Sequence, residues 1–562
     1  MAWQDVTRKK REQIAALIPP EWRFSSQAIP SRITQPNIVH MVPLFLSPFE
    51  EEITTLPVPQ LLQALHCGRF TAREVVAAYC HRATLAHQRV QCLSEINFES
   101  AAQRAAELDG YWRAHGGPIG PLHGLPISLM DRFNVAGLDS TSGFASWVGN
   151  AKTADDEGVL VQHLRALGAV IFCKTNVPMS MMVGETVNNT IGTTWNPQNR
   201  TLSAGGACGG EGALIALKGS PLGIGTELAG SSRIPAAFNG IYALKICEAR
   251  LPRDGLVTVV SVRAVLFPKY GQLTCQMRGL PIAAGSIGLL SSSISGLQTV
   301  FRALLDSSPW INDAETLEMP WRQDKYAAIA ARTHRSGHAD GRLVFGLLSS
   351  DGHVQPHPDI ERAMHNVRQA LQQRGYEFRI FGSNSGISIR EAIKASSEPP
   401  IMQVKAWYEQ GHVDGLSATE LWELCHVHFE YRKRYADYWR EMSNRTRSGR
   451  AVDGVIQPVA ATTAVRDGEF HYYGYTAVAN VLDYPAAAFP VQVGSSSFDD
   501  NMPHGPPFNA VDALVRSCYR PEDAKGMPVG LQVIGQRHHE EHVLAMVQAI
   551  SSALSEYNPA MA

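Results

Sequence analysis

The feature that most constrains the fold is a series of short apolar runs, each bounded by glycine or proline. Runs of about five to eight such residues are typical of strands buried on both faces. Segments with helical periodicity lie between them, so we expect an α/β fold with a large mixed, mainly parallel β-sheet core covered by helices on both faces. The runs are "LPISLM" (125–130), "GAVIFCKTN" (168–176), "SPLGIGTE" (220–227), "RLVFGLLSS" (342–350), "DGVIQPV" (453–459) and "GMPVGLQVIG" (526–535).

The chain is expected to form one domain preceded by an arm. Residues 1–58 are broken by prolines and predict an extended N-terminal arm with one short helix near 7–17. Residues 59–562 predict a single domain, which starts with helical periodicity. An insertion is expected at about 358–450, where "PDIERAMHNVRQALQQRG" has amphipathic spacing. We interpret it as a helical cap, with a substrate-gating lid as the alternative.

Charge and composition exclude several classes of protein. The net charge is −2 with 18% charged residues, which gives no basic face for a nucleic acid. The N-terminus lacks a secretory apolar run, and no window approaches the roughly 18 apolar residues of a membrane span. The nine cysteines form no CxxC pair, so reduced thiols are expected. These features predict a soluble, cytoplasmic protein without a cofactor, with a homodimer as a possible assembly.

The densest chemical signal is the glycine-rich stretch from Arg200 to Lys245. Backbone N–H groups freed at such turns can hold a phosphate or the oxyanion of an acyl-transfer intermediate. The Walker pattern GxxxxGK[ST] is missing, and "GIGTELAG" lacks the GxGxxG spacing of dinucleotide sites. The oxyanion interpretation fits better, because the loop residues Leu228, Ala229 and Gly230 lead directly into Ser231.

This stretch resembles the amidase signature family of serine hydrolases, whose pattern is roughly GGSSGGxxA followed by GTDxGGSxRxPAxxxGxxGLKP. "GGACGGEGA" (205–213) and "GTELAGSSRIPAAFNGIYALKI" (225–246) match it. "LPISLMDRFNVAG" resembles the family's lysine strand, and further segments match up to "GMPVGLQVIGQR". The resemblance covers nearly all of the chain from about residue 60, and is greatest to fungal acetamidase-like and fatty-acid-amide-hydrolase-like members.

The resemblance implies a Ser–cis-Ser–Lys triad, in which a neutral lysine takes a proton through a bridging serine and so activates the nucleophilic serine. The nucleophile falls on Ser231, the bridging serine on Ala207 and the lysine on Met130. A thioether and a methyl group neither accept nor relay a proton usefully. We therefore expect a degenerate triad and predict that ordinary amidase activity is absent.

Five residues in or beside the loop could contribute to a replacement site or to its support. Cys208 could be a nucleophile with a lowered pKa at a helix start, or simply a small buried residue. Asp131 could act as a base, although strand alternation sends it to the face opposite Met130. Glu227 and Arg233 are expected to form an ion pair that braces the loop, with direct substrate contact as the alternative. Ser231 itself could donate a hydrogen bond to a substrate carbonyl, or be a relic of the family's chemistry.

The C-terminal "HHEEH" (538–542) matches a zinc-protease pattern. No third ligand is evident, and the segment opens an amphipathic helix, so we predict no metal.

Three functions remain open from the sequence. The first is a non-hydrolytic enzyme that carries out cyclisation, isomerisation, elimination or condensation on a carbonyl- or amide-bearing small molecule. The second is a hydrolase with a rewired nucleophile. The third is a non-catalytic pseudoenzyme that binds a small molecule or a partner protein.

Overall fold

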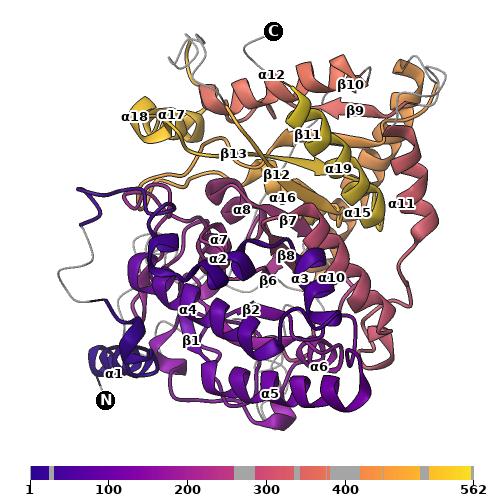
Figure 1. Cartoon of the computed structure of the whole chain (residues 1–562). Helices are drawn as coiled ribbons and strands as arrows, with labels where there is room; N and C mark the ends of the chain where they lie inside the picture. Colours follow the sequence, from indigo (N-terminus) through magenta and orange to yellow (C-terminus); the bar gives the residue numbers. More distant parts are fainter. Residues whose placement is uncertain are drawn as a thin grey trace.

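The computed structural model describes residues 2–24, 31–257, 285–333, 342–374, 376–379, 418–446, 449–493 and 505–557. Within these residues the core is an 11-stranded sheet in the order β1-β3-β2-β6-β8-β7-β12-β13-β11-β9-β10. Helices flank this sheet, and the chain runs from α1 at one end of the molecule to α12, α17 and α18 at the other (Figure 1). The expected α/β class with a large mixed sheet is confirmed.

Each of the six apolar runs singled out in the sequence contains one strand of the large sheet. The strands of the large sheet are β1 (Leu93–Ile96), β2 (Pro126–Met130), β3 (Val170–Thr175), β6 (Leu222–Glu227), β7 (Tyr242–Lys245), β8 (Ser286–Ser291), β9 (Val344–Leu347), β10 (Glu377–Arg379), β11 (Gly454–Pro458), β12 (Ala486–Val491) and β13 (Val529–Ile534). A separate small hairpin pairs β4 (Val187–Asn188) with β5 (Gly192–Thr193).

Parallel pairings lie in two blocks of the large sheet. β2 pairs in parallel with β3 and β6, and β9 pairs in parallel with β10 and β11. Between the two blocks, β8, β7, β12 and β13 pair antiparallel with their neighbours. Of the two strands in the glycine-rich centre, β6 belongs to the first block and β7 to the antiparallel region.

The described helices range from one turn to more than six. They are α1 (Trp3–Ala16), α2 (Pro48–Thr55), α3 (Val58–His66), α4 (Ala72–Val90), α5 (Phe98–His115), α6 (Val159–Ala166), α7 (Gly209–Ala216), α8 (Arg233–Asn239), α10 (Ile294–Asp306), α11 (Gln323–Ala330), α12 (Pro358–Gln373), α15 (Ala418–Glu441), α16 (Gly474–Val481), α17 (Ala510–Ser517), α18 (Pro521–Ala524) and α19 (Glu540–Glu556). Helix α4 begins with a capping box, in which Thr71 and Glu74 satisfy each other's backbone N–H groups.

The N-terminal arm is tied to the domain by a buried charge. The Lys10 ammonium of α1 contacts the carboxylates of Glu95 and Asp139, and its distance to Asp139 Oδ2 is 2.9 Å. Burial is costly for an ammonium unless such partners compensate it. The arm therefore packs on the domain through a specific contact.

The two described helices of the expected 358–450 insertion pack differently. Helix α12 buries an apolar face that includes Ile360, Met364 and Val367 in the main core, so this end of the insertion belongs to the helical layer of the domain. Helix α15 packs through Tyr435 and Trp439 in a second, smaller core cluster. Much of the segment between them lies outside the described residues.

Candidate functional site

The glycine-rich centre forms a tight turn between β6 and α8. Gly230 has φ +124°, a conformation that L side chains rarely adopt, and a Cβ there would lie 2.5 Å from Thr476 Oγ1. Glycine is therefore needed at this position. The turn leaves Leu228, Ala229 and Ser231 partly exposed, while Glu227 before it and Ser232 after it are fully buried.

The Glu227 carboxylate holds the turn together. It accepts hydrogen bonds from the N–H groups of Gly230 and Ser232, the latter at 2.8 Å, and from the Ser232 hydroxyl. The expected ion pair with Arg233 is present, with 3.2 Å between Arg233 NH2 and Glu227 Oε1. Although burial acts in the opposite direction, the Arg233 charge and these hydrogen bonds lower the pKa of Glu227.

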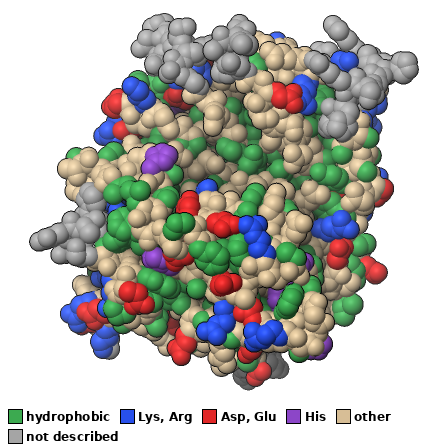
Figure 2. All heavy atoms as spheres, in the orientation of Figure 1, with side chains coloured by type: hydrophobic (Ala, Val, Ile, Leu, Met, Phe, Trp, Pro, Cys, Tyr) green, Lys and Arg blue, Asp and Glu red, His purple; other side chains and the backbone are tan. Residues whose placement is uncertain are grey.

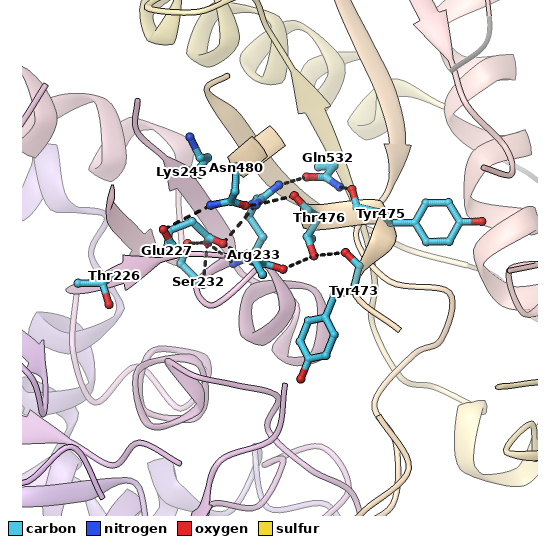
Figure 3. Close-up of polar contacts among 12 residues, drawn as sticks. Thr226, Glu227, Ser232, Arg233, Lys245, Tyr473, Tyr475, Thr476, Asn480 and Gln532 are labelled. Atoms are coloured by element: carbon cyan, nitrogen blue, oxygen red, sulfur yellow. Dashed lines mark hydrogen bonds and ion pairs between the residues drawn. The ribbon is translucent and has the colours of Figure 1, made fainter. Parts of the chain in front are cut away.

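Arg233 in turn reaches across to the neighbouring elements. Its guanidinium donates to Gln532 Oε1 at 2.6 Å, to Asn480 Oδ1 at 2.7 Å and to the Thr476 carbonyl at 3.0 Å. Figure 3 shows these contacts converging on Arg233 from β13 and α16. Both terminal nitrogens of this guanidinium thus donate to acceptors of the protein, which makes Arg233 a brace of the loop.

The N–H groups of the loop do not all remain free. Gly230 N–H donates to Glu227, which corrects the expectation that this group would serve an oxyanion. Within the described residues, no hydrogen bond engages the N–H groups of Leu228 and Ala229 or the Ser231 hydroxyl. These three donors are the ones that a ligand carbonyl could use.

Ala207 and Cys208 lie directly beside the loop. The Gly206–Ala207 peptide bond is cis, and α7 begins after Cys208. Cys208 N–H donates to the Ser231 carbonyl at 2.9 Å, which joins the two glycine-rich segments. A Cβ on Gly225 of β6 would lie 2.3 Å from Cys208 Sγ, so that glycine makes room for the thiol.

The Cys208 thiol is fully buried. Burial, reinforced by the nearby Glu227 charge, raises its pKa well above the ordinary thiol value. Of the two alternatives that the sequence left open, this favours the small buried residue over the low-pKa nucleophile, because loss of solvation outweighs any effect of the helix end. A thiol in this state is a poor nucleophile.

Met130 ends β2 and is completely buried. Its Sδ atom lies 3.5 Å from Cys208 Sγ and 3.4 Å from Thr226 Oγ1. The thioether therefore fills the space between β6 and the start of α7, where the family resemblance places a lysine. Thioether sulfur is only a weak hydrogen-bond acceptor.

Asp131 faces away from Met130, as strand alternation predicts. Its carboxylate pairs with the buried Lys174 ammonium at 2.8 Å and accepts a hydrogen bond from the Thr141 hydroxyl. Lys174 also donates to Ser140 Oγ at 2.9 Å. Both charges are thus committed to the contact between β2, β3 and the loop at 139–142.

Sequence reasoning missed three polar residues next to Met130 and Cys208. Thr226 contacts Met130, Arg132 donates from NH1 to Thr226 Oγ1 at 3.1 Å, and Glu211 lies on the first turn of α7. Burial raises the pKa of Glu211 to about 8, while Ser128 and Thr175 hydroxyls hydrogen-bond to it. Arg132 lies inside the segment that resembles the lysine strand, two residues after Met130. A basic residue so close to the missing lysine was the sequence signal that could have identified it as a site residue.

The C-terminal histidine motif does not assemble as a zinc-protease site. Within the described part of the chain, one group with metal-ligand chemistry brings Cys247, His538 and Glu540 together, with ligand atoms within 4.8 Å of one another. However, Glu540 already accepts from Arg250 at 2.6 Å, and Glu541 also pairs with Arg250 at 3.0 Å. Arginine-neutralised carboxylates are poor partners for a divalent cation.

Comparisons with known proteins agree with this fold. The sequence profile of the Amidase family matches residues 74–385 and 387–544. An acetamidase of Aspergillus oryzae is 35% identical over 98% of this chain and 99% of its own length, and an acetamidase of Emericella nidulans is 33% identical over 98% of both. The chain therefore belongs to the amidase family.

Solved structures extend the likeness to three dimensions. A structure of fatty acid amide hydrolase matches with a TM-score of 0.84 and 27% identity, covering 98% of this chain and 95% of that one. A structure of 6-aminohexanoate cyclic dimer hydrolase in complex with its substrate matches with a TM-score of 0.66 at 19% identity, over 90% and 98% of the two chains, which shows a shared fold. In the regions that the structure describes, no helix has the length and apolar character needed to cross a membrane.

Proposed function

We propose that this amidase-family protein has a degenerate triad and binds a carbonyl- or amide-bearing small molecule without hydrolysing it by the Ser–Ser–Lys mechanism. The observation that carries the proposal is the position of Met130 Sδ, 3.5 Å from Cys208 Sγ and 3.4 Å from Thr226 Oγ1. The triad mapping puts the general base at this point, and a thioether cannot take a proton from a serine relay. Ala207 leaves the relay without a hydroxyl.

The neighbouring carboxyl groups support the same proposal, because each of them is bound by other residues of the protein. Asp131 is held by Lys174, Glu227 by Arg233, and Glu211 by two hydroxyl groups. None of them forms a hydrogen bond to Ser231 within the described residues. A serine hydroxyl without a base is a weak nucleophile, but it remains a good hydrogen-bond donor.

A site of this kind polarises a bound carbonyl but lacks the base that hydrolysis by the Ser–Ser–Lys mechanism needs. The Ser231 hydroxyl and the Leu228 and Ala229 N–H groups would donate to the carbonyl oxygen and stabilise developing negative charge. Cyclisation, isomerisation, elimination or condensation of a bound metabolite fits this arrangement. On the face shown in Figure 2, acidic and basic side chains are intermingled, so the described residues of this face form no large basic patch of the kind that binds a nucleic acid. A cytoplasmic location and a homodimer complete the proposal.

The test is to restore the missing groups. Ammonia release from acetamide and butyramide is measured for the wild type, Ser231→Ala and the double variant Met130→Lys/Ala207→Ser. Met130→Leu/Ala207→Ser is the matched control, because it changes the same positions without adding an amine. We expect hydrolysis only in the lysine-containing variant. Hydrolysis by the wild type that disappears in Ser231→Ala would refute the proposal.

A second experiment addresses what the natural protein does. The wild type and Ser231→Ala are incubated with metabolite extract of the source organism, and the products are compared by mass spectrometry. Conversion of a compound without addition of water supports the non-hydrolytic enzyme. If a compound binds saturably and no compound is converted, the result supports the non-catalytic binding function.

A further inference from the structure

Arg132 places a positive charge at the edge of the Met130 cluster. Its Nε donates to the Val257 carbonyl at 2.8 Å, and its NH1 donates to Thr226 Oγ1 at 3.1 Å. The same Thr226 oxygen lies 3.4 Å from Met130 Sδ. Thr226 thus contacts both the Arg132 guanidinium and Met130, the position where the family resemblance locates the catalytic amine.

Thr226 and Glu227 point to different sides of β6, as consecutive strand residues do. Figure 3 shows Thr226 lying apart from the contacts that join Glu227 and Arg233 to Asn480 and Gln532. Arg132 therefore contacts β6 through Thr226, whereas Arg233 contacts it through Glu227. The two arginines have different surroundings.

Arg132 has no carboxylate partner among the described residues, in contrast to Arg233. Its neighbour Arg253 is itself paired with Glu248 at 2.9 Å and Glu315 at 3.1 Å. The sequence that follows Val257, residues 258–284, contains three basic residues and no Asp or Glu. No acidic side chain from that stretch of sequence can neutralise the guanidinium.

Arg132 nevertheless carries its charge at neutral pH. Burial, together with the like charge of Arg253, lowers its pKa to about 10, which is still well above 7. A partly buried cation with two of its donors used by a carbonyl and a hydroxyl keeps further N–H groups for another acceptor. A guanidinium is well suited to hold a carboxylate because its planar donors match two oxygens at once.

We propose that the ligand of this site carries a carboxylate in addition to its carbonyl group, and that Arg132 binds this carboxylate. This inference rests on the proposed function, because it assumes that the ligand occupies the space beside Met130 and the Ser231 loop. Arg132 then fixes the orientation of the ligand, while Ser231 and the free loop N–H groups meet the carbonyl. The substrate class is an anionic amide or keto acid.

The test uses two probes that differ in one terminal group. Succinamate and butyramide have the same four-carbon chain and the same amide, but succinamate ends in a carboxylate where butyramide ends in a methyl group. Their dissociation constants are measured by isothermal titration calorimetry for the wild type, Arg132→Gln and Arg132→Lys. Arg466→Gln is the control, because it removes an arginine charge from an exposed pair with Asp523. Thermal unfolding of each variant verifies that it is folded.

We expect the wild type to bind succinamate at least about tenfold more tightly than butyramide, since hydrogen bonds between charged groups typically contribute this much. Arg132→Gln should weaken succinamate binding by about 10- to 100-fold and leave butyramide unchanged. Arg132→Lys should retain part of the preference for succinamate over butyramide, and Arg466→Gln should retain all of this preference.

Three results would overturn the inference. The first is that the wild type binds both probes with equal affinity. The second is that Arg132→Gln loses affinity for both probes to the same extent. The third is that succinamate does not bind the wild type with a dissociation constant below about 10 mM, which corresponds to negligible affinity. Ammonia release from succinamate by the wild type that stops in Ser231→Ala is a separate outcome. It would refute the non-hydrolytic function and leave the carboxylate preference of Arg132 standing.

Discussion

Replacing Glu227 by glutamine tests whether this carboxylate holds the Ser231 loop. The substitution keeps the size of the side chain but leaves the buried Arg233 guanidinium without its counter-charge. It also places an amide donor among N–H and O–H groups that already donate to Glu227. Removing one partner of a buried ion pair typically costs about 3–5 kcal/mol.

The corresponding change in melting temperature follows from the size of the chain. Unfolding entropy is about 2.1 cal/mol/K per residue near 60 °C, which for 562 residues gives about 1.2 kcal/mol/K. A loss of about 3–5 kcal/mol therefore lowers the melting temperature by about 3–4 °C. Because the folded state lowers the pKa of Glu227, its contribution is fully present at pH 7 and is lost as the pH falls through the folded pKa.

The assay is differential scanning calorimetry at pH 7 and a fixed scan rate. The wild type is compared with Glu227→Gln, Arg233→Met and the double variant. We expect the double variant to lose less stability than the sum of the two single variants, because it buries no unpaired charge. A shift below about 1 °C for Glu227→Gln, or strict additivity in the double variant, would refute the bracing role.

Three further predictions concern the same region. Gly230→Ala should destabilise the protein by about 1–3 kcal/mol because φ is +124° and the new methyl would meet Thr476 Oγ1 at 2.5 Å; a melting temperature unchanged from wild type would contradict this. Cys208 should resist iodoacetamide in the native state, since burial raises its thiol pKa; peptide mass spectrometry showing rapid native alkylation would disprove it. The raised pKa of Glu211 should make stability fall as the pH rises from about 4.5 to about 8, and Glu211→Gln should flatten that decline in pH-dependent calorimetry; identical slopes would count against it.

The sequence alone determined the fold class and the location of the candidate site. Each of the six glycine- or proline-bounded apolar runs contains a strand, because buried strands need short continuous apolar segments and turns need residues with unusual backbone freedom. The pairing of Glu227 with Arg233 and the opposite facing of Met130 and Asp131 also followed from local spacing and strand alternation. These features depend on neighbours along the chain.

Only the tertiary structure decided the state of the side chains. The sequence left open whether the Cys208 thiol has a lowered pKa, and its enclosure by β6 and Met130 is what raises this pKa. The antiparallel centre of the sheet and the contact of Arg132 with Thr226 join residues that are far apart in sequence. Burial and electrostatic environment arise from such distant contacts, and local sequence patterns do not encode them.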